Sequence, residues 1–269
     1  MKAADFDYER PRSLAHALSA LAEPDVESRP LAGGQSLVPL MALRLSRPGL
    51  LVDLNRIPGL DGIRVDGTTL HIGAMTRQRD VELSPVVQAH APLLSRAAAH
   101  IGHVTIRNRG TIGGSLAHAD SAAEIPAAAV ALGAEVVLTS ERGERVLPVT
   151  EFLVGHYTTA IEPGELLTEV RIDVGNPDQH WAFVEFTQRS GDFALAGAAV
   201  RLILDGNRVT QAVIVPLAAG GVPARVLAAE QLLEGEILTP QRIEQAAAAM
   251  DHRELTAVMT RRALLEAGR

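Results

Sequence analysis

Two short stretches with adjacent glycines most constrain the fold of this chain. The first, residues 31–36, reads LAGGQS and is followed by the apolar run LVPLMALRL. The second, residues 106–126, reads IRNRGTIGGSLAHADSAAEIP and leads into an alanine-rich segment that predicts a helix. Glycine has no Cβ, so such backbone turns sharply and approaches a ligand closely. Each stretch alone is also typical of an ordinary turn.

The two stretches together indicate a particular kind of ligand. Consecutive N–H groups in a glycine-rich turn form a concavity that suits a phosphate oxygen, and the hydroxyls of Thr111 and Ser115 would add donors. A mononucleotide needs one such loop, whereas two loops can bind one diphosphate from opposite sides. The pair therefore indicates a dinucleotide-type cofactor. No G-x-G-x-x-G occurs in the chain, so this cofactor would bind without the Rossmann fingerprint.

Composition excludes several other kinds of site. The chain has 269 residues and a formal net charge of −7, so it lacks the basic field that nucleic-acid binding requires. The absence of cysteine excludes disulfides, zinc–thiolate sites, iron–sulfur clusters and cysteinyl-flavin links within the chain. Lys2 is the only lysine, so neither a Walker-type loop nor a pyridoxal Schiff base is available. No apolar run approaches the ~20 residues of a membrane helix, and the N-terminus lacks a signal region, so we expect a cytoplasmic protein.

Hydrophobic periodicity predicts the order of elements along the chain. Residues 174–180, VGNPDQH, are the most linker-like segment and predict a domain boundary. Before this boundary the patterns predict a helix capped by Ser13 at 13–21, strands at 50–55 and 68–75, a helical segment at 84–103 interrupted by Pro92, a helix at 123–133, a hairpin at 134–149 and a strand at 166–174. Beyond it they predict three antiparallel strands with turns at 190–192 and 205–207, then helices at 226–235, 240–250 and 254–268.

Two histidines near the end of the predicted helical segment have competing interpretations. His100 and His103 are three residues apart, a spacing that a metal site could use. No carboxylate or third histidine is positioned to complete a ligand set, however. The pattern therefore favours a pair of helix-end histidines, one of which packs, over a metal site.

Half of the aromatic residues lie at the start of the last predicted domain. Trp181, Phe183, Phe186 and Phe193 fall within thirteen residues, and the whole chain has only eight aromatic side chains. This grouping is typical of the core of a three-stranded sheet. Phe193 follows a Gly-Asp turn, so it could instead stand at the domain edge and press against a flat ring held by the other domain.

Three motifs resemble those of a known family. AGGQS at 32–36, RNRGTIGGSLAHAD at 107–120 and QRSGDFALAG at 188–197 resemble the FAD-binding medium subunit of molybdenum hydroxylases, the family of carbon monoxide dehydrogenase and xanthine dehydrogenase. The likeness runs nearly end to end. It implies an α+β fold, with a PCMH-type FAD-binding domain at 1–175 in subdomains of about 1–55 and 56–175. A C-terminal flavoprotein domain at 176–269 would follow, with a three-stranded antiparallel sheet and a helical bundle.

The resemblance also implies which residues bind the cofactor. Glu124 matches an acid that accepts a hydrogen bond from the ribose, although aspartate is usual in the xanthine-oxidising branch. Phe193 stands where some members place a tyrosine against the flavin, so a phenolic hydroxyl is missing here. Gln35 replaces a histidine of some relatives. The full implied set comprises one side of the diphosphate (Ala32, Gly33, Gly34, Gln35 and Ser36), its other side (Gly110, Thr111, Gly113, Gly114 and Ser115), the ribose acid Glu124, and the flavin neighbours Ile101, Leu167 and Phe193.

The function implied by the resemblance is electron transfer through non-covalently bound FAD. Iron–sulfur clusters would lie on a separate small subunit and molybdopterin on a separate large one, in a dimer of heterotrimers. Electrons would pass from the clusters through FAD to an external acceptor, and we expect neither a catalytic side chain nor a metal ligand in this chain. Two alternatives remain open: a stand-alone flavin-dependent oxidoreductase acting on a small molecule, and a non-catalytic binding or assembly protein that has lost the cofactor.

Overall fold

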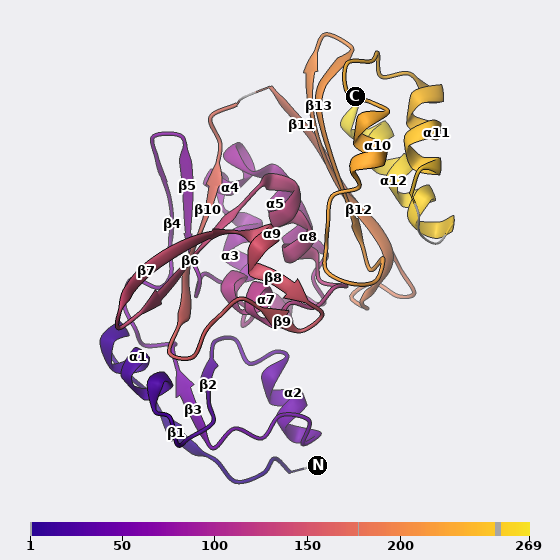
Figure 1. The fold of residues 1–269 in the computed structure, drawn as a ribbon. Helices are drawn as coiled ribbons and strands as arrows, with labels where there is room; N and C mark the ends of the chain where they lie inside the picture. The colour runs from indigo at the N-terminus through magenta and orange to yellow at the C-terminus, as the bar shows by residue number, and fades with distance from the viewer. Residues whose placement is uncertain (1, 177, 251–253) are drawn as a thin grey trace.

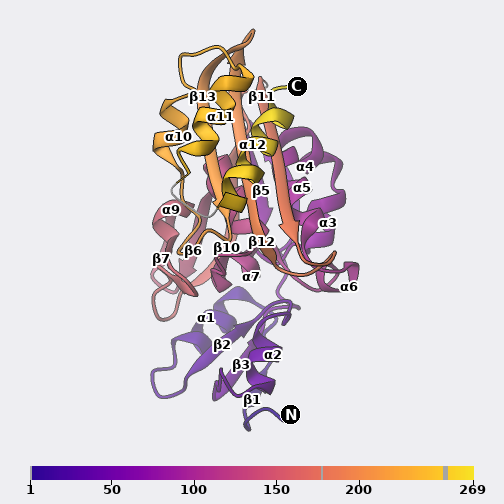
Figure 2. The same ribbon diagram turned by 90° about the vertical axis from the view of Figure 1, so that its right-hand side faces the viewer.

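The structure is a computed structural model that describes residues 2–176, 178–250 and 254–269 (Figure 1). Its strands form a three-stranded sheet near the N-terminus, a five-stranded sheet in the middle of the chain, a three-stranded sheet near the C-terminus and a two-stranded ribbon. The N-terminal sheet lies at one end of the molecule, and the C-terminal sheet with its helices lies alongside the five-stranded sheet and its helices (Figures 1 and 2). None of the helices in the described part of the chain has the length and apolar character of a membrane span.

The N-terminal sheet is parallel, in the order β1-β3-β2. The predicted helix at 13–21 and strand at 50–55 are confirmed as α1 and β3, and the Ser13 hydroxyl caps α1 by accepting from the N–H of His16 at 3.3 Å. The first glycine stretch connects β2 to α2. The bounds in this region are β1 (Asp7–Glu9), α1 (Leu14–Ala22), β2 (Ser28–Leu31), α2 (Leu37–Ala42) and β3 (Leu50–Asp53).

The middle sheet is antiparallel, in the order β4-β5-β10-β6-β7. Its strands are β4 (Ile63–Asp66), β5 (Thr69–Gly73), β6 (Glu135–Ser140), β7 (Gly143–Pro148) and β10 (Leu166–Asp173). The chain between β5 and β6 forms α3 (Gln78–Leu83), α4 (Pro85–His90), α5 (Pro92–His100), α6 (Val104–Arg107), α7 (Ile112–His118) and α8 (Glu124–Leu132). Pro92 separates α4 from α5, as predicted, and apolar side chains of α5, α7 and α8 share one core with the sheet.

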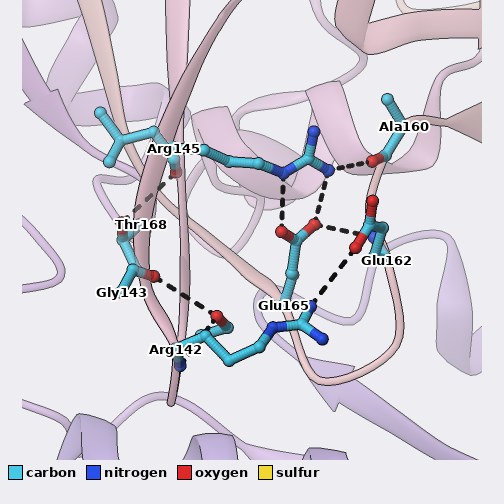
Figure 3. Close-up of polar contacts among 9 residues, drawn as sticks. Arg142, Gly143, Arg145, Ala160, Glu162, Glu165 and Thr168 are labelled. Carbon is cyan, nitrogen blue, oxygen red and sulfur yellow. Dashed lines mark hydrogen bonds and ion pairs between the residues drawn. The ribbon is translucent and has the colours of Figure 1, made fainter.

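A partly buried ion pair fixes the loop that leads into β10 (Figure 3). Arg145 of β7 binds both carboxylate oxygens of Glu165 at 2.7 Å and also donates to the carbonyl of Ala160. Glu165 accepts a further hydrogen bond from the N–H of Glu162 at 2.8 Å. The Arg145 guanidinium outweighs burial and lowers the pKa of the Glu165 carboxyl. The loop is therefore held on the sheet directly before Leu167, one of the residues predicted to lie beside the flavin.

Two small elements complete the middle region. The helix α9 (Val149–Phe152) follows β7, and the ribbon of β8 (Leu153–Gly155) and β9 (Thr158–Thr159) leads toward β10. Phe152 is fully buried, so this short connection contributes to the same core.

The C-terminal sheet is antiparallel, in the order β11-β12-β13, and has a different core on each face. One face carries Phe183, Ala199 and Val213 into the core of the middle region, whereas Ala182, Val200 and Ile214 on the other face pack under helices. These helices cover the outer face in Figure 2. The bounds are β11 (Gln179–Thr187), β12 (Ala194–Asp205), β13 (Arg208–Leu217), α10 (Leu227–Gln231), α11 (Pro240–Ala248) and α12 (Glu254–Ala267).

The helix α8 lies between the middle region and the C-terminal sheet. It packs against α5 and α7 on one side and against β12 and β13 on the other. All nine of its residues are buried. The predicted strands and helices beyond residue 180 are confirmed, but residue 177 of the predicted linker lies outside the described residues, so the domain limits stay a prediction.

Candidate functional site

The two glycine stretches touch one another in the folded chain. A Cβ added to Gly33 would lie 2.2 Å from the carbonyl oxygen of Arg109 and 2.8 Å from the Cα of Gly110. A Cβ added to Gly114 would lie 3.7 Å from the Cβ of Ala32. Only glycine permits this approach of one backbone to the other. The stretches therefore lie against one another, and their binding of one ligand from two sides stays a prediction.

The first stretch exposes its backbone donors. Within the described residues, the N–H groups of Gly33, Gly34, Gln35 and Ser36 have no hydrogen-bond acceptor in the protein. Gly34 has a φ of +72°, which favours glycine, and this conformation turns the chain into α2. The Gln35 side chain donates to the carbonyl of Gly33 at 2.8 Å, within the loop. Successive free N–H groups of this kind can bind an anion.

The second stretch uses its backbone donors internally, which differs from the prediction. Its two adjacent glycines, Gly113 and Gly114, lie in the first helical turn of α7 and not in a loop. Thr111 caps this helix, because its hydroxyl accepts from the N–H of Gly114 at 3.0 Å. The N–H of Ile112 donates to Thr76, and that of Gly113 to Ala74. The predicted nest of free N–H groups is therefore wrong for this stretch, because the cap and the neighbouring 74–76 segment satisfy these donors.

Glycines in the second stretch serve close packing instead. A Cβ on Gly113 would lie 2.5 Å from the Cβ of Ala74, and one on Gly110 would lie 2.3 Å from the side-chain oxygen of Gln78. A Cβ on Gly114 would lie 2.7 Å from the hydroxyl oxygen of Thr111. The hydroxyl-bearing Ser115, half-buried in the same turn, is the residue of this stretch best suited to donate to a ligand.

Arg77 and Asn55 hold the two stretches together. The Asn55 amide donates to the carbonyl of Ala32 at 2.9 Å, and its own oxygen accepts from Arg77 at 2.6 Å. Arg77 also donates to the carbonyl of Arg109 at 2.5 Å. Burial, with the nearby charge of Arg109, lowers the pKa of the Arg77 guanidinium. Sequence reasoning missed both residues, although Asn55 directly follows a predicted strand.

A cavity of about 620 Å³ opens beside the first stretch. Its lining includes residues 31–35, Tyr8, Arg10, Asn55 and Arg109. The Asp53 carboxylate at its edge accepts from the Tyr8 hydroxyl and pairs with Arg10 at 3.1 Å. Burial opposes ionisation of Asp53, but the hydrogen bonds from Tyr8 and Asn55, with Arg10, outweigh it and lower its pKa. The cavity thus combines the free N–H groups of the first stretch with Arg10 and Arg109 in its lining, a combination that suits a negatively charged ligand.

Ile101, Leu167 and Phe193 do not line this cavity. Ile101 directly follows α5 and is half-buried, whereas Leu167 of β10 is buried. Phe193, between β11 and β12, is 71% exposed, so it is an edge residue and not part of the sheet core. Its loop reaches the segment after α5, since a Cβ on Gly191 would lie 2.6 Å from the His103 ring.

Glu124 is the first residue of α8 and is only 6% exposed. Burial raises the pKa of its carboxyl from 4.5 to about 7, and the nearby charge of Glu185 adds to this shift. His100 and Asp120 are its other ionisable neighbours. A buried carboxyl of this kind needs hydrogen-bond donors, which the hydroxyls of a sugar would supply.

Two family models match this chain. Residues 4–173 match the FAD binding domain in molybdopterin dehydrogenase, and residues 181–263 match the CO dehydrogenase flavoprotein C-terminal domain. Together these ranges account for most of the described residues. They also separate the first two sheets from the last one, in agreement with the observed architecture.

Known proteins with similar sequences are subunits of dehydrogenase complexes. The chain is 46% identical over 250 residues to subunit alpha of the 6-hydroxypseudooxynicotine dehydrogenase complex of Paenarthrobacter nicotinovorans, covering 93% of this chain and 84% of the relative. It is 38% identical to the carbon monoxide dehydrogenase medium chain of Hydrogenophaga pseudoflava, covering 91% and 85%.

Solved structures agree with these matches. A carbon monoxide dehydrogenase from Hydrogenophaga pseudoflava, in a form that lacks the Mo-pyranopterin moiety, superposes with a TM-score of 0.95 at 36% identity, covering 99% of this chain and 98% of the other. Quinoline 2-oxidoreductase from Pseudomonas putida 86 gives a TM-score of 0.94 at 36% identity, covering 100% and 98%. The chain therefore belongs to the FAD-binding flavoprotein family of the molybdenum hydroxylases, to which the medium chain of carbon monoxide dehydrogenase belongs.

Proposed function

We propose that this chain is the FAD-carrying electron-transfer subunit of a multi-subunit molybdenum hydroxylase. A small iron–sulfur subunit and a large molybdopterin subunit are its partners, in a cytoplasmic dimer of heterotrimers. FAD, when bound, accepts electrons from the iron–sulfur clusters and passes them to an external acceptor. The relatives that are named as medium or alpha subunits of complexes support this assignment.

The observation that carries the proposal is the direct contact between the two glycine stretches beside a charged cavity. The free N–H groups of residues 33–36 would bind the diphosphate oxygens, with Arg109 supplying positive charge. Gly113 and Gly114 would let the start of α7 come close from the other side, with the Ser115 hydroxyl as a donor. Residues Gly110 and Thr111 would shape this turn, and Ala32 would complete the contact between the stretches.

The flavin end of the cofactor would extend from this clamp toward the C-terminal sheet. Ile101 and Leu167 would pack beside the flavin ring, and the exposed ring of Phe193 would cover it. The Glu124 carboxyl would accept from the ribose. Three groups of residues from three parts of the chain would thus orient one ligand and exclude water from its ring.

Purification of the chain together with its partners tests the proposal. We expect about one FAD per chain in a yellow complex that also contains iron and molybdenum. A complex without stoichiometric flavin would contradict the proposal. Turnover of a small substrate by the isolated flavin-loaded chain would favour the stand-alone oxidoreductase instead, and a folded pure chain that does not bind added FAD would favour the cofactor-free alternative.

Gly114→Val tests the clamp itself. The new side chain would displace the Thr111 hydroxyl, 2.7 Å from its Cβ, and crowd the space next to Ala32, so we expect FAD to be lost from the folded complex. Gly155→Val is the matched control, since its Cβ would lie at an ordinary 3.5 Å from Thr158 and its backbone is already extended. Full flavin content in a folded Gly114→Val complex would count against the clamp.

A further inference from the structure

Three residues, Ile101, Gly102 and His103, connect α5 to α6 and form what we call the connecting segment. Ile101 is one of the residues predicted to lie beside the flavin ring. The ring of His103 reaches the loop between β11 and β12, because a Cβ on Gly191 would lie only 2.6 Å from it. That loop also holds Phe193, so the connecting segment lies between the two predicted neighbours of the flavin ring.

Arg107, the last residue of α6, binds the connecting segment by its backbone. Nη1 of its guanidinium donates to the carbonyl of Ile101 at 2.8 Å and to that of Gly102 at 3.1 Å. The last carbonyls of a helix have no partner within it, and a basic side chain can bind them. Gly102 has a φ of +44°, a conformation that favours glycine, so the backbone bends sharply where Arg107 binds it.

Glu82 anchors Arg107 to α3. Its Oε2 lies 2.7 Å from Nε of Arg107, and the two side chains are only 14% and 12% exposed. Its backbone carbonyl accepts from the Ser95 hydroxyl of α5 at 2.7 Å, so α3 and α5 form one frame. Arg79 binds the other oxygen, Oε1, at 2.6 Å, but among the described residues it donates to no carbonyl of the connecting segment. Two arginines therefore share one acid, and only Arg107 extends this anchor to the connecting segment.

The contacts of Arg107 favour a role in positioning and not in binding an anion. Its Nε and Nη1 already donate to a carboxylate and two carbonyls within the protein. Arg109, by contrast, lines the cavity beside the first glycine stretch. A planar guanidinium has donors in fixed directions, so it can hold an acid and two carbonyls at once.

We propose that Arg107 is a positioning residue of the cofactor site: from its anchor on Glu82 it fixes the connecting segment, and it thereby sets where the flavin ring lies between Ile101 and Phe193. Arg107 itself touches no part of FAD in this arrangement. Its loss would change the surroundings of the ring and leave the diphosphate contacts in place. This inference rests on the proposed function, because it requires FAD in the clamp.

Arg107→Gln in the purified complex tests the inference with two measurements. Amide hydrogen exchange follows the N–H of Ile101, bonded to Ala98, and that of Ile106, bonded to His103. We expect both amides to exchange about 10- to 100-fold faster, the usual effect of losing hydrogen bonds to a charged group. The flavin-loaded complex should keep about one FAD per chain, but its visible absorption bands and its reduction potential should shift.

Arg79→Gln is the matched control, because it removes the other arginine from the same acid and leaves the two carbonyl contacts of Arg107 intact. It should exchange within about threefold of the wild type, less than the loss of one hydrogen bond to a charged group would give, and keep the wild-type flavin spectrum. Arg107→Lys keeps the charge beside Glu82 but lacks the planar fork, so its exchange rates should fall between those of the wild type and Arg107→Gln. Equal changes in Arg79→Gln and Arg107→Gln would overturn the inference, because loss of an ion pair would then explain both.

Gly102→Ala displaces the same segment with Arg107 intact, since its Cβ would lie 3.2 Å from Cγ1 of Ile106 on a left-handed backbone. It should shift the flavin spectrum as well, and it decides the question if the Arg107 variants do not assemble. A wild-type spectrum and potential in Arg107→Gln or in Gly102→Ala would overturn the inference, and so would loss of FAD from a folded Arg107→Gln complex, which would make Arg107 a binding residue. A wild-type complex that binds no FAD would contradict the proposed function and this inference together, whereas normal flavin binding with an unchanged spectrum in the variants contradicts this inference alone.

Discussion

The two glycine stretches share a composition but use glycine for different physical reasons. In residues 32–36 the N–H groups are free, and Gly34 adopts a φ of +72° that other residues rarely take. In residues 110–115 the donors of Gly113 and Gly114 are already bonded, and the glycines make room for Ala74 and Thr111. The first stretch is therefore suited to bind an anion with its backbone, and the second to bring a helix close to it.

This comparison shows why a glycine motif by itself does not identify an anion site. From the sequence alone, both stretches look equally suited to bind a phosphate, because the sequence shows where the backbone can bend. It does not show which N–H groups other parts of the chain satisfy. Substitutions that act on one kind of glycine and not the other can separate the two roles.

Gly33→Val should have the largest effect, because Gly33 is the point where the stretches meet. Its Cβ would lie 2.2 Å from the backbone oxygen of Arg109, and backbone cannot swing away as a side chain can. We expect destabilisation by about 3 kcal/mol and loss of bound FAD. Urea unfolding and flavin content measure the two effects. Normal values for both would show that the stretches do not need their contact.

The buried carboxyl of Glu124, which follows the second stretch, should make the stability of the chain depend on pH. Glu124 has a pKa of about 7 in the folded chain against 4.5 in the unfolded chain. Below pH 4.5 both states hold the proton. Between pH 4.5 and 7 the unfolded chain ionises first, so the free energy of unfolding should fall with rising pH, by about 3 kcal/mol in total.

Glu124→Gln should remove this component of the pH dependence. Urea unfolding of the flavin-free chain at several pH values between 4.5 and 8 checks it, with the variant and the wild type compared at each pH. The stability difference should grow in favour of the variant as pH rises. A constant difference across this range would contradict the assignment.

Thr111→Val and Ser36→Ala compare the hydroxyls at the start of the two helices. Thr111 caps α7, whereas Ser36 at the start of α2 makes no side-chain capping hydrogen bond. Thr111→Val should therefore cost about 1 kcal/mol of stability as well as FAD affinity. Ser36→Ala should lower FAD affinity and leave the melting temperature near that of the wild type. Equal losses of stability would remove this difference between the stretches.

Gly34→Ala should have a small effect on stability. The left-handed backbone of Gly34 costs an alanine about 1 kcal/mol. Gly59→Ala is the matched control, since Gly59 has a φ of +80° with open space around it. Both variants should lose similar stability in thermal unfolding, but only Gly34→Ala should also bind FAD less tightly. Equal FAD affinity in both would show that the loop tolerates the change.

Sequence patterns were sufficient for most of the fold. The long strands β10 to β13 and the helices α1, α8 and α12 have clear periodicity and turn residues at their ends. The three-residue β1 and four-residue α6 carry too little pattern to be recognised. The helix α7 was missed because adjacent glycines disfavour a helix, whereas the Thr111 cap and tertiary hydrogen bonds stabilise it here.

The candidate site was predictable only in part. The glycine stretches and the edge position of Phe193 could be inferred from local residues. The contact of Gly33 with Arg109, and the bridging of the stretches by Arg77, join segments more than 30 residues apart, so they depend on tertiary structure.

The complete burial of α8 bears on how the chain unfolds. Its alanines, valine and leucine are enclosed half by the FAD-binding domain and half by the C-terminal sheet. Lifting the sheet away would bring this apolar helix into water, at a cost of roughly 25 cal/mol for each Å² exposed. The two segments that the family models match separately should therefore not unfold independently of one another. We expect calorimetry of the chain to record a single unfolding transition.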